Sequence, residues 1–294
     1  MSGILQFVVV GLLEGGLYAL VGATIVLVYK STQVASLAHG QILAFGALFC
    51  YIFYSVLGLP LIVALLLTFA AAYGMGFLIE RIAMRPLIGQ PLFAAFLNTF
   101  ALYIILDGVL NIVLKGGVAD FPDLLPSGSL RLSLINIPIS QFVSFMVALF
   151  LFGLLALFFR FTKIGLNMLA TAENHQLAQS VGIRVKQVFS MVWGLSALLA
   201  AVAGMASANV MDISFFLPNL GINGLTVALF GGLDSIPGAL LGGLILGIFE
   251  NAAAGYLDPL VGGGVKEVAG YAMMLLILLV RPYGLFGQVR IERI

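Results

Sequence analysis

The chain has 294 residues, of which 62% are hydrophobic and 9% are charged, and its formal net charge is +1. Soluble domains carry about 25% charged residues, so this composition excludes an ordinary water-soluble domain, and the near-zero net charge argues against a nucleic-acid-binding protein. The single cysteine, Cys50, excludes an intrachain disulfide and a cysteine-based metal site. Because helices satisfy their own backbone hydrogen bonds in lipid, the composition predicts an all-α, polytopic transmembrane helical bundle.

Several apolar runs are long enough to span a bilayer, which takes about 20 residues of helix. In chain order the predicted spans are Ile4–Tyr29, Leu43–Leu57 (approached by the less apolar Val34–Ile42), Pro60–Ile79, Leu92–Leu114, Phe142–Phe159, Val188–Val210 and Glu267–Val280. The first is too long for a signal peptide, so we expect it to be retained. A further apolar stretch, Gly221–Glu250, is rich in glycine and is broken at Asp234–Gly238. We expect about eight full spans plus one or two short or broken half-helices, in a single domain over residues 1–294.

Lysine and arginine are distributed unequally between alternate ends of these spans, at about ten to three. The rich side holds Lys30, Arg81, Arg85, Arg160, Lys163, Arg184, Lys186, Arg281, Arg290 and Arg293, and the poor side holds Lys115, Arg131 and Lys266. The positive-inside rule places the N-terminus outside and the C-terminus in the cytoplasm. The chain must then cross an odd number of times between Val210 and Arg281. Gly221–Glu250 therefore forms either two short crossing helices or a segment that enters and returns to the same side.

Two polar, glycine-containing breaks interrupt apolar sequence, at Ser36–Gln41 and Asp234–Gly238. A stretch with small residues follows each break: Ala44, Gly46 and Ala47 in one case, and Gly242, Gly243 and Gly247 in the other. Small residues permit close helix packing, and broken helices line translocation paths in transporters, so both interpretations stay open. The similarity of the two breaks suggests an internal repeat.

Polar residues within apolar runs are candidates for lining a path. The pathway candidates are Glu14, His39, Gln41, Asn98, Asn223 and Thr226. Of two further carboxylates, Asp107 is expected to cap a kink at Gly108 and Glu250 to lie near the membrane interface. No basic residue is expected at comparable depth, so no buried ion pair is predicted. His39 and His175 fall in different segments, so we expect no metal, and no cofactor or enzymatic constellation either.

Residues 160–187 are polar enough to leave the membrane. Their apolar residues recur at helical spacing, which predicts a short amphipathic helix or helix pair ending at Gly182. The apolar positions are Leu166, Leu169, Ala172, Leu177, Ala178 and Val181. Helices that lie on anionic lipid usually carry Lys and Arg on the polar face. Here that face holds Glu173, Asn174, His175, Gln176 and Gln179 instead, which favours docking against a protein.

This segment resembles the permease subunit of branched-chain amino acid ABC importers, and the resemblance extends over essentially the whole chain. The matching residues in and after the segment are Thr162–Gly165, Ala170–Asn174, Ala178, Gly182–Ile183, Trp193, Ser196–Ala197 and Ala203–Gly204. Elsewhere they are Gly16–Leu20, Ser36–Gly40, Glu80–Arg81, Arg85–Leu87, Ala228, Gly231–Gly232, Gly238–Ala239, Gly242, Arg281–Pro282 and Gly284–Gly287. The segment is similar to the family's variant of the loop that docks on the ATPase, which implies an ATPase-coupling role for Gly165, Ala172, Glu173, Asn174, Ala178, Gly182 and Ile183. Asn174 departs from the general importer pattern, in which a second small residue is usual.

The resemblance implies half of a translocation pathway for branched-chain or aliphatic amino acids, in a bacterial or archaeal plasma membrane. The implied partners are a second homologous permease subunit, cytoplasmic ATP-binding subunits and an extracytoplasmic solute-binding protein. The sequence contains no glycine-rich phosphate loop ending in Gly-Lys-Ser/Thr, so we expect a transport subunit without its own ATPase site rather than an enzyme. Similar permeases that handle urea or short amides remain an alternative. So does a stand-alone secondary transporter or channel, which would need a coupling-ion site.

Overall fold

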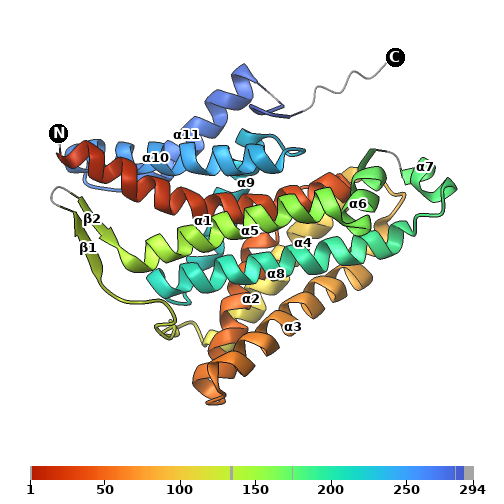
Figure 1. Ribbon diagram of the computed structural model, residues 1–294, viewed down its shortest axis with the longest axis horizontal. Coiled ribbons are helices and arrows are strands. Elements are labelled where there is room, and N and C mark those ends of the chain that lie inside the picture. Colours follow the sequence, from red (N-terminus) through yellow and green to blue (C-terminus); the bar gives the residue numbers. More distant parts are fainter. Residues whose placement is uncertain (1, 133–134, 174, 282, 288–294) are drawn as a thin grey trace.

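The computed structural model describes residues 2–132, 135–173, 175–281 and 283–287, and helices dominate them, as predicted (Figure 1). The α-helices are α1 (Ser2–Thr32), α2 (His39–Tyr51), α3 (Leu61–Ile79), α4 (Leu92–Leu114), α5 (Ile139–Phe161), α6 (Lys163–Glu173), α7 (His175–Ser180), α8 (Val185–Met211), α9 (Leu220–Gly231), α10 (Ile236–Val261) and α11 (Val265–Val280). Short π- or 3-10-helical segments are η1 (Ile52–Val56), η2 (Glu80–Met84), η3 (Arg85–Leu87) and η4 (Leu217–Asn219). Within the predicted loop between α4 and α5, β1 (Ser129–Leu132) and β2 (Ile135–Pro138) form an antiparallel hairpin.

Among the described residues, seven helical stretches are long and apolar enough to cross a membrane. They are Ile4–Thr32, His39–Val56, Leu61–Leu87, Leu92–Leu114, Ile139–Phe161, Val185–Met211 and Ile236–Val261. Two shorter helices, α9 with 12 residues and α11 with 16, complete the set. A helix of α11's length covers about 24 Å, a little less than the hydrocarbon core of a bilayer. The expectation of a polytopic bundle with additional short helices is confirmed, and the chain is a multi-pass membrane protein.

The glycine-rich region is a short helix followed by a full-length one, so the expectation that Gly221–Glu250 forms two short crossing helices is wrong. The alternative, in which the segment enters and returns to the same side, stays a prediction. α9 ends at Gly231, and α10 starts at Ile236 and continues for 26 residues. The Ser235 hydroxyl caps α10 by accepting a hydrogen bond from the Gly238 backbone N–H at 3.0 Å. A proline in the first turn of α10 is compatible with this start, since the first helical N–H groups have no partner within the helix.

Long helices α1 and α8 run side by side in opposite directions and organise the bundle (Figure 1). α1 packs against α9 and α10, and α8 packs against α2 and α3. α1 therefore contacts the two helices that follow α8, and α8 contacts the two helices that follow α1. On the α1 side the contact depends on small residues, because a Cβ on Gly11 or Gly15 would strike the backbone of α10 at Gly247 or Gly243. The predicted close packing of small residues is thus confirmed.

The two long helices also end alike. Each is followed by a non-glycine residue with left-handed backbone, Gln33 at φ 61° and Asp212 at φ 58°. A stretch without α-helix then leads into a short helix, α2 or α9, and the first turns of these helices touch at Gly40 and Gly221. The predicted repeat is present in a different place: the break at Ser36–Gln41 corresponds to residues 212–219, not to Asp234–Gly238.

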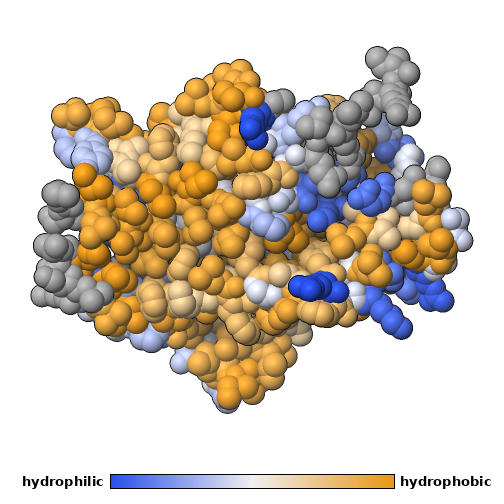
Figure 2. All heavy atoms as spheres, turned by 45° about the horizontal axis from the view of Figure 1, so that its top comes forward, coloured by the Kyte–Doolittle hydropathy of each residue, from blue (hydrophilic) through white to orange (hydrophobic). Residues whose placement is uncertain are grey.

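The surface agrees with a membrane setting. Apolar residues cover most of the face shown in Figure 2, and hydrophilic residues gather mainly towards the end that carries α6 and α7. Large side chains such as Ile62 and Ile112 are 73% and 77% exposed, as expected for helices that face lipid.

Candidate functional site

The first candidate region is the junction where α2 begins, and it joins three helices through one buried hydrogen-bond chain. His39 Nε2 lies 2.8 Å from Ser196 Oγ on α8, and the Ser196 hydroxyl donates to the Thr24 carbonyl of α1 at 2.8 Å. All three side chains are buried, and the Trp193 ring lies against His39 with centroids 5.7 Å apart. His39 is therefore a buried polar contact that ties the start of α2 to α8, and its place in a pathway stays a prediction.

Unpartnered polar groups concentrate at this same junction. Gln41 is fully buried, and neither end of its amide has a hydrogen-bond partner among the residues that the structure describes. The Ser36 hydroxyl and the Trp193 indole N–H are also buried without a partner. Each such group costs about 1–3 kcal/mol, so a cluster of them is expected only where polarity serves a purpose.

The second region is a pair of adjoining cavities of 80 and 270 Å³, which share Tyr18, Met211, Leu220 and Lys266 and which we call the Lys266 cavity. Six α-helices line it: α1, α5, α8, α9, α10 and α11. The smaller part adds Glu14, Leu17, Gln141, Ser207 and Val210. The larger part adds Phe216, Asn219, Asn223, Glu250, Glu267 and Tyr271. Polar and charged groups thus meet aliphatic side chains in one space.

An ion pair stands in this cavity, where none was predicted. Lys266 Nζ on α11 lies 2.6 Å from Glu14 Oε2 on α1, and the side-chain amide of Asn251 on α10 donates to the same oxygen at 2.8 Å. The expectation that Glu14 has no basic partner is wrong. The two residues seemed to lie at different depths, because Lys266 is at the start of α11 while Glu14 is well inside α1. Only the packing of the two helices brings them together.

Glu250 is buried within the protein at 2% exposure, and among the described residues its Oε2 has no hydrogen-bond partner. Its expected depth near the membrane interface stays a prediction. Tyr18 on α1 and Asn223 on α9 line the same space as the Glu250 carboxylate. Glu14 and Asn223, two of the pathway candidates, therefore belong to one cavity, and Glu250 joins them.

Asn98 and Thr226 lie outside this cavity. The Asn98 amide donates to the Ala83 carbonyl at 3.0 Å, which ties α4 to η2. Thr226 donates to the Ile222 carbonyl of its own helix at 3.0 Å, as threonine commonly does inside a helix. Asp107 accepts from Asn111 one turn along α4, which runs through Gly108 without interruption, so the predicted kink is absent.

The third region is the predicted cytoplasmic segment, which forms the helix pair α6 and α7. α6 folds back on α5, because the Thr162 hydroxyl accepts from the Gly165 N–H at 2.9 Å and Gly165 lies against the Phe158 backbone. Ala178 on α7 is buried with Val185 and Phe189 of α8. Gly182 follows α7 at φ 87°, as predicted for a helix end.

The proposed docking residues have different environments. Gly165 and Ala178 are buried and hold the helix pair in place, Ala172 and Ile183 are half-buried, and Glu173 and Gly182 are exposed. Asn174 lies outside the described residues. Three large apolar side chains on the pair are also well exposed: Leu166 at 64%, Leu177 at 65% and Val181 at 75%.

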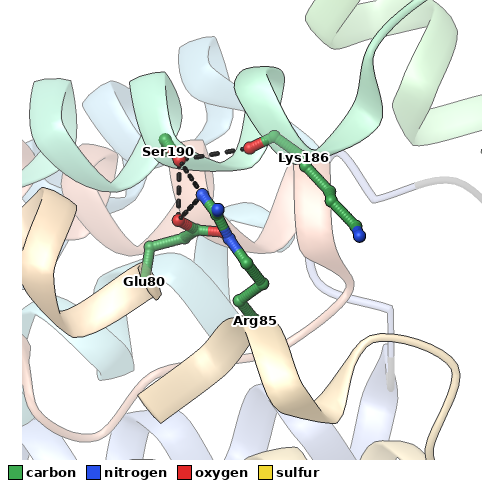
Figure 3. Close-up of polar contacts among 4 residues, drawn as sticks. All are labelled: Glu80, Arg85, Lys186 and Ser190. Atoms are coloured by element: carbon green, nitrogen blue, oxygen red, sulfur yellow. Dashed lines mark hydrogen bonds and ion pairs between the residues drawn. The ribbon is translucent and has the colours of Figure 1, made fainter. Parts of the chain in front are cut away.

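A buried polar cluster ties the start of α8 to the end of α3 (Figure 3). Arg85 makes two hydrogen bonds to Glu80, at 3.0 and 2.7 Å. The Ser190 hydroxyl on α8 donates to Glu80 Oε2 at 2.6 Å and accepts from Arg85 Nη2 at 2.7 Å. The Glu80 side chain is fully buried, and η2 is a π-helical turn that places Glu80 and Arg85 on one side. The family resemblance includes Glu80 and Arg85, but the sequence did not predict that they form an ion pair. Their spacing of five residues was the available signal for that pair.

Comparisons with known proteins agree along nearly the whole chain. The family model described as "Branched-chain amino acid transport system / permease component" matches residues 7–280. The high-affinity branched-chain amino acid transport system permease protein BraD of Pseudomonas aeruginosa is 30% identical, over 99% of this chain and 98% of that protein. The probable branched-chain amino acid transport permease protein LivH of Methanocaldococcus jannaschii is 31% identical, over 94% and 90%. A solved structure of PsaBC from Streptococcus pneumoniae in complex with Fab aligns with a TM-score of 0.48 and 16% identity, covering 95% of this chain and 91% of that one.

Proposed function

The chain belongs to the family of branched-chain amino acid transport system permease components, and we propose that it forms one half of the pathway of an ATP-driven importer of branched-chain and other aliphatic amino acids. In this proposal residues 1–294 are a single membrane domain. Residues 160–187 extend from it on the cytoplasmic side to meet the motor. The N-terminus is extracytoplasmic and the C-terminus is cytoplasmic.

The observation that carries the proposal is the α6–α7 helix pair between two long membrane helices. Three large apolar side chains stay exposed on it: Leu166, Leu177 and Val181. The hydrophilic surface gathers at the same end of the molecule, so this end faces water rather than lipid (Figure 2). Exposed apolar side chains on a rigid, water-facing element are typical of a protein interface.

The contacts of α8 offer a route by which an ATPase could move the membrane helices. α7 packs on the first turns of α8 through Ala178, and the Glu80–Arg85–Ser190 cluster joins the next turn of α8 to α3. A displacement of the helix pair by an ATPase would therefore move α8 and the end of α3 together, as a rigid body. α8 continues to the outer part of the bundle, where Met211 lines the Lys266 cavity.

The motor and the delivery of substrate belong to other chains in this proposal. The partners are a second homologous permease, cytoplasmic ATP-binding subunits and an extracytoplasmic solute-binding protein. The substrate class follows from the relatives, two of which are named as permeases for branched-chain amino acids.

The test is transport by the reconstituted complex. The chain is expressed with the second permease, the ATP-binding subunits and the solute-binding protein of its own organism, and labelled leucine, isoleucine and valine are offered to proteoliposomes. We expect ATP-dependent uptake that survives an ionophore and disappears when the ATP-binding lysine of the motor subunits is replaced. Uptake of urea or a short amide in preference to leucine would overturn the substrate. Uptake that collapses with an ionophore and needs no ATP would overturn the mechanism.

A further inference from the structure

The charges around the Lys266 cavity do not balance. Three carboxylates line it, those of Glu14, Glu250 and Glu267, with Lys266 as the cation among the residues that line its two parts. Glu14 is matched by Lys266 at 2.6 Å. Glu250 is buried to 2% exposure, and its Oε2 has no hydrogen-bond partner within the part of the chain that the structure describes. A buried carboxylate is costly unless it is paired or hydrogen-bonded on both oxygens, so this cavity offers a place for a second cation.

Lys266 has capacity for an anion as well. Its ammonium group carries three N–H donors, and the contact with Glu14 uses one of them. Glu14 is held independently by the Asn251 amide at 2.8 Å, so it stays in place if Lys266 bonds a further group. The Lys266 side chain is 32% exposed, which leaves its end accessible.

The rest of the lining is aliphatic or aromatic. Leu17, Val210, Met211, Leu220 and Phe216 surround the charged groups from α1, from α8, and from the segment that leads into α9. An apolar wall beside one unsatisfied carboxylate and one available ammonium matches a small molecule with an ammonium, a carboxylate and a branched hydrocarbon side chain.

We propose that the Lys266 cavity is a substrate subsite within the permease that binds the zwitterionic head group of an aliphatic α-amino acid. Glu250 Oε2 accepts the ammonium group, Lys266 donates to the carboxylate, and Met211 and Leu220 contact the side chain. Tyr18 shares the larger part of the cavity with Glu250. This inference rests on the proposed amino acid substrate and adds the residues that recognise it.

The chemistry separates this subsite from one for urea or a short amide. Urea and short amides have no charged group, so an unpaired buried carboxylate and a lysine would not bind them in preference to an amino acid. Removal of either charge should therefore weaken the handling of a zwitterion.

The first test uses the complete importer with its unaltered solute-binding protein. Glu250→Gln and Lys266→Met keep approximate size and remove one charge each. We expect each to lower the number of leucine molecules imported per ATP hydrolysed by at least tenfold, in complexes that co-purify in the wild-type ratio of subunits. Asp107→Asn is the matched control, because Asp107 is a half-buried membrane carboxylate bonded only within its own helix, and it should import leucine as the wild type does.

A second test does not require transport. Cys50 is the natural cysteine and is buried, so Met211→Cys places one reactive thiol in the cavity wall. Leucine should slow its reaction with a small maleimide at least threefold, and neither isovalerate nor isoamylamine should do so at the same concentration. Adding Glu250→Gln should abolish this protection.

The outcomes distinguish the subsite from the proposed function. If the wild-type importer carries no amino acid, the proposed function fails. If it imports leucine, and both charge variants import leucine at the wild-type ratio to ATP, the function stands and the subsite is wrong. The subsite also fails if Asp107→Asn loses as much uptake, or if uptake requires Na⁺ and Glu250→Gln removes only that requirement.

Discussion

Gly40 and Gly221 lie with their backbones in direct contact, so that a Cβ on Gly221 would meet the Cα of Gly40 and a Cβ on Gly40 would meet the Pro218 carbonyl. The two residues lie in the first turns of α2 and α9, the short helices that follow α1 and α8. This contact is where the two similar halves of the bundle meet. It exists because neither residue has a side chain.

Replacing either glycine should destabilise the bundle. We expect Gly40→Ala and Gly221→Ala each to cost about 1–3 kcal/mol, as extra atoms in a packed interior do. The measurement is the unfolding midpoint of the purified protein in detergent. Gly74→Ala and Gly108→Ala are the controls, since both sites are helical and have open space around the added methyl group. Those two should be neutral or stabilising by about 0.5 kcal/mol, and equal losses in all four variants would contradict the proposed contact.

The Glu80–Arg85–Ser190 cluster should matter for both stability and coupling. Glu80→Gln leaves Arg85 without its paired charge, and we expect a loss of about 3 kcal/mol, at the low end for a broken buried pair. Arg85→Lys keeps the charge but loses the two-pronged geometry, and should cost about 1 kcal/mol. Substrate-stimulated ATPase activity of the assembled complex should fall in both.

Arg81 supplies the control for that cluster. It lies in the same π-helical turn but interacts with the face of Phe77, at 5.9 Å from the ring centroid. Arg81→Lys should change the unfolding free energy by less than about 0.5 kcal/mol and leave stimulation intact. If Arg81→Lys were as damaging as Arg85→Lys, charge alone rather than the contact with Glu80 and Ser190 would explain the effect.

The exposed side of α6 and α7 should be needed for the motor and not for the fold. We expect Val181→Asp and Glu173→Lys to reduce co-purification of the ATP-binding subunits at least fivefold while the permease itself elutes and unfolds normally. Val118→Asp is the control, because Val118 is 62% exposed, compared with 75% for Val181, and lies in the loop after α4. Retention of the ATP-binding subunits by both α6–α7 variants would show that the motor docks elsewhere.

The His39–Ser196 contact should be measurable as a coupling energy. His39→Leu and Ser196→Ala each leave a buried partner short of one hydrogen bond, at about 1–3 kcal/mol each. The double variant should lose less than the sum of the two, by about 0.5–3 kcal/mol, because the shared contact is counted only once. Chemical unfolding of the four proteins provides the cycle. Simple additivity would mean that the two side chains do not depend on each other.

The sequence predicted the environment and most of the elements. Apolar runs of spanning length located the long helices other than α10 to within a few residues, since a helix in lipid must be continuously apolar. The helical spacing over residues 160–187, with Gly182 after it, predicted the helix pair that became α6 and α7. The break before α2 was also visible, because polar residues with a glycine interrupt an apolar run there.

What failed shares one cause. The interruption near Asp234–Gly238 is present, since α9 ends at Gly231 and α10 starts at Ile236, but it does not match the break before α2. The matching break, at residues 212–219, looked like an ordinary loop. Asp107 was expected to mark a kink, but its neighbour Asn111 satisfies it within an unbroken helix. Local polarity reveals that a helix is interrupted or a charge is present, and it does not reveal which distant residue lies opposite.

The sequence by itself therefore determined that the chain lies in lipid, which stretches are helical and which segment leaves the membrane. Each of these depends on composition or on spacing along one helix. Only the tertiary structure decided that Lys266 pairs with Glu14, that Glu250 is buried without a partner on one oxygen, and that Gly40 meets Gly221. Those contacts join residues on helices far apart in the chain. Their partners are set by which helix faces pack together, and in lipid that choice depends on close steric fit rather than on a hydrophobic pattern that a sequence displays.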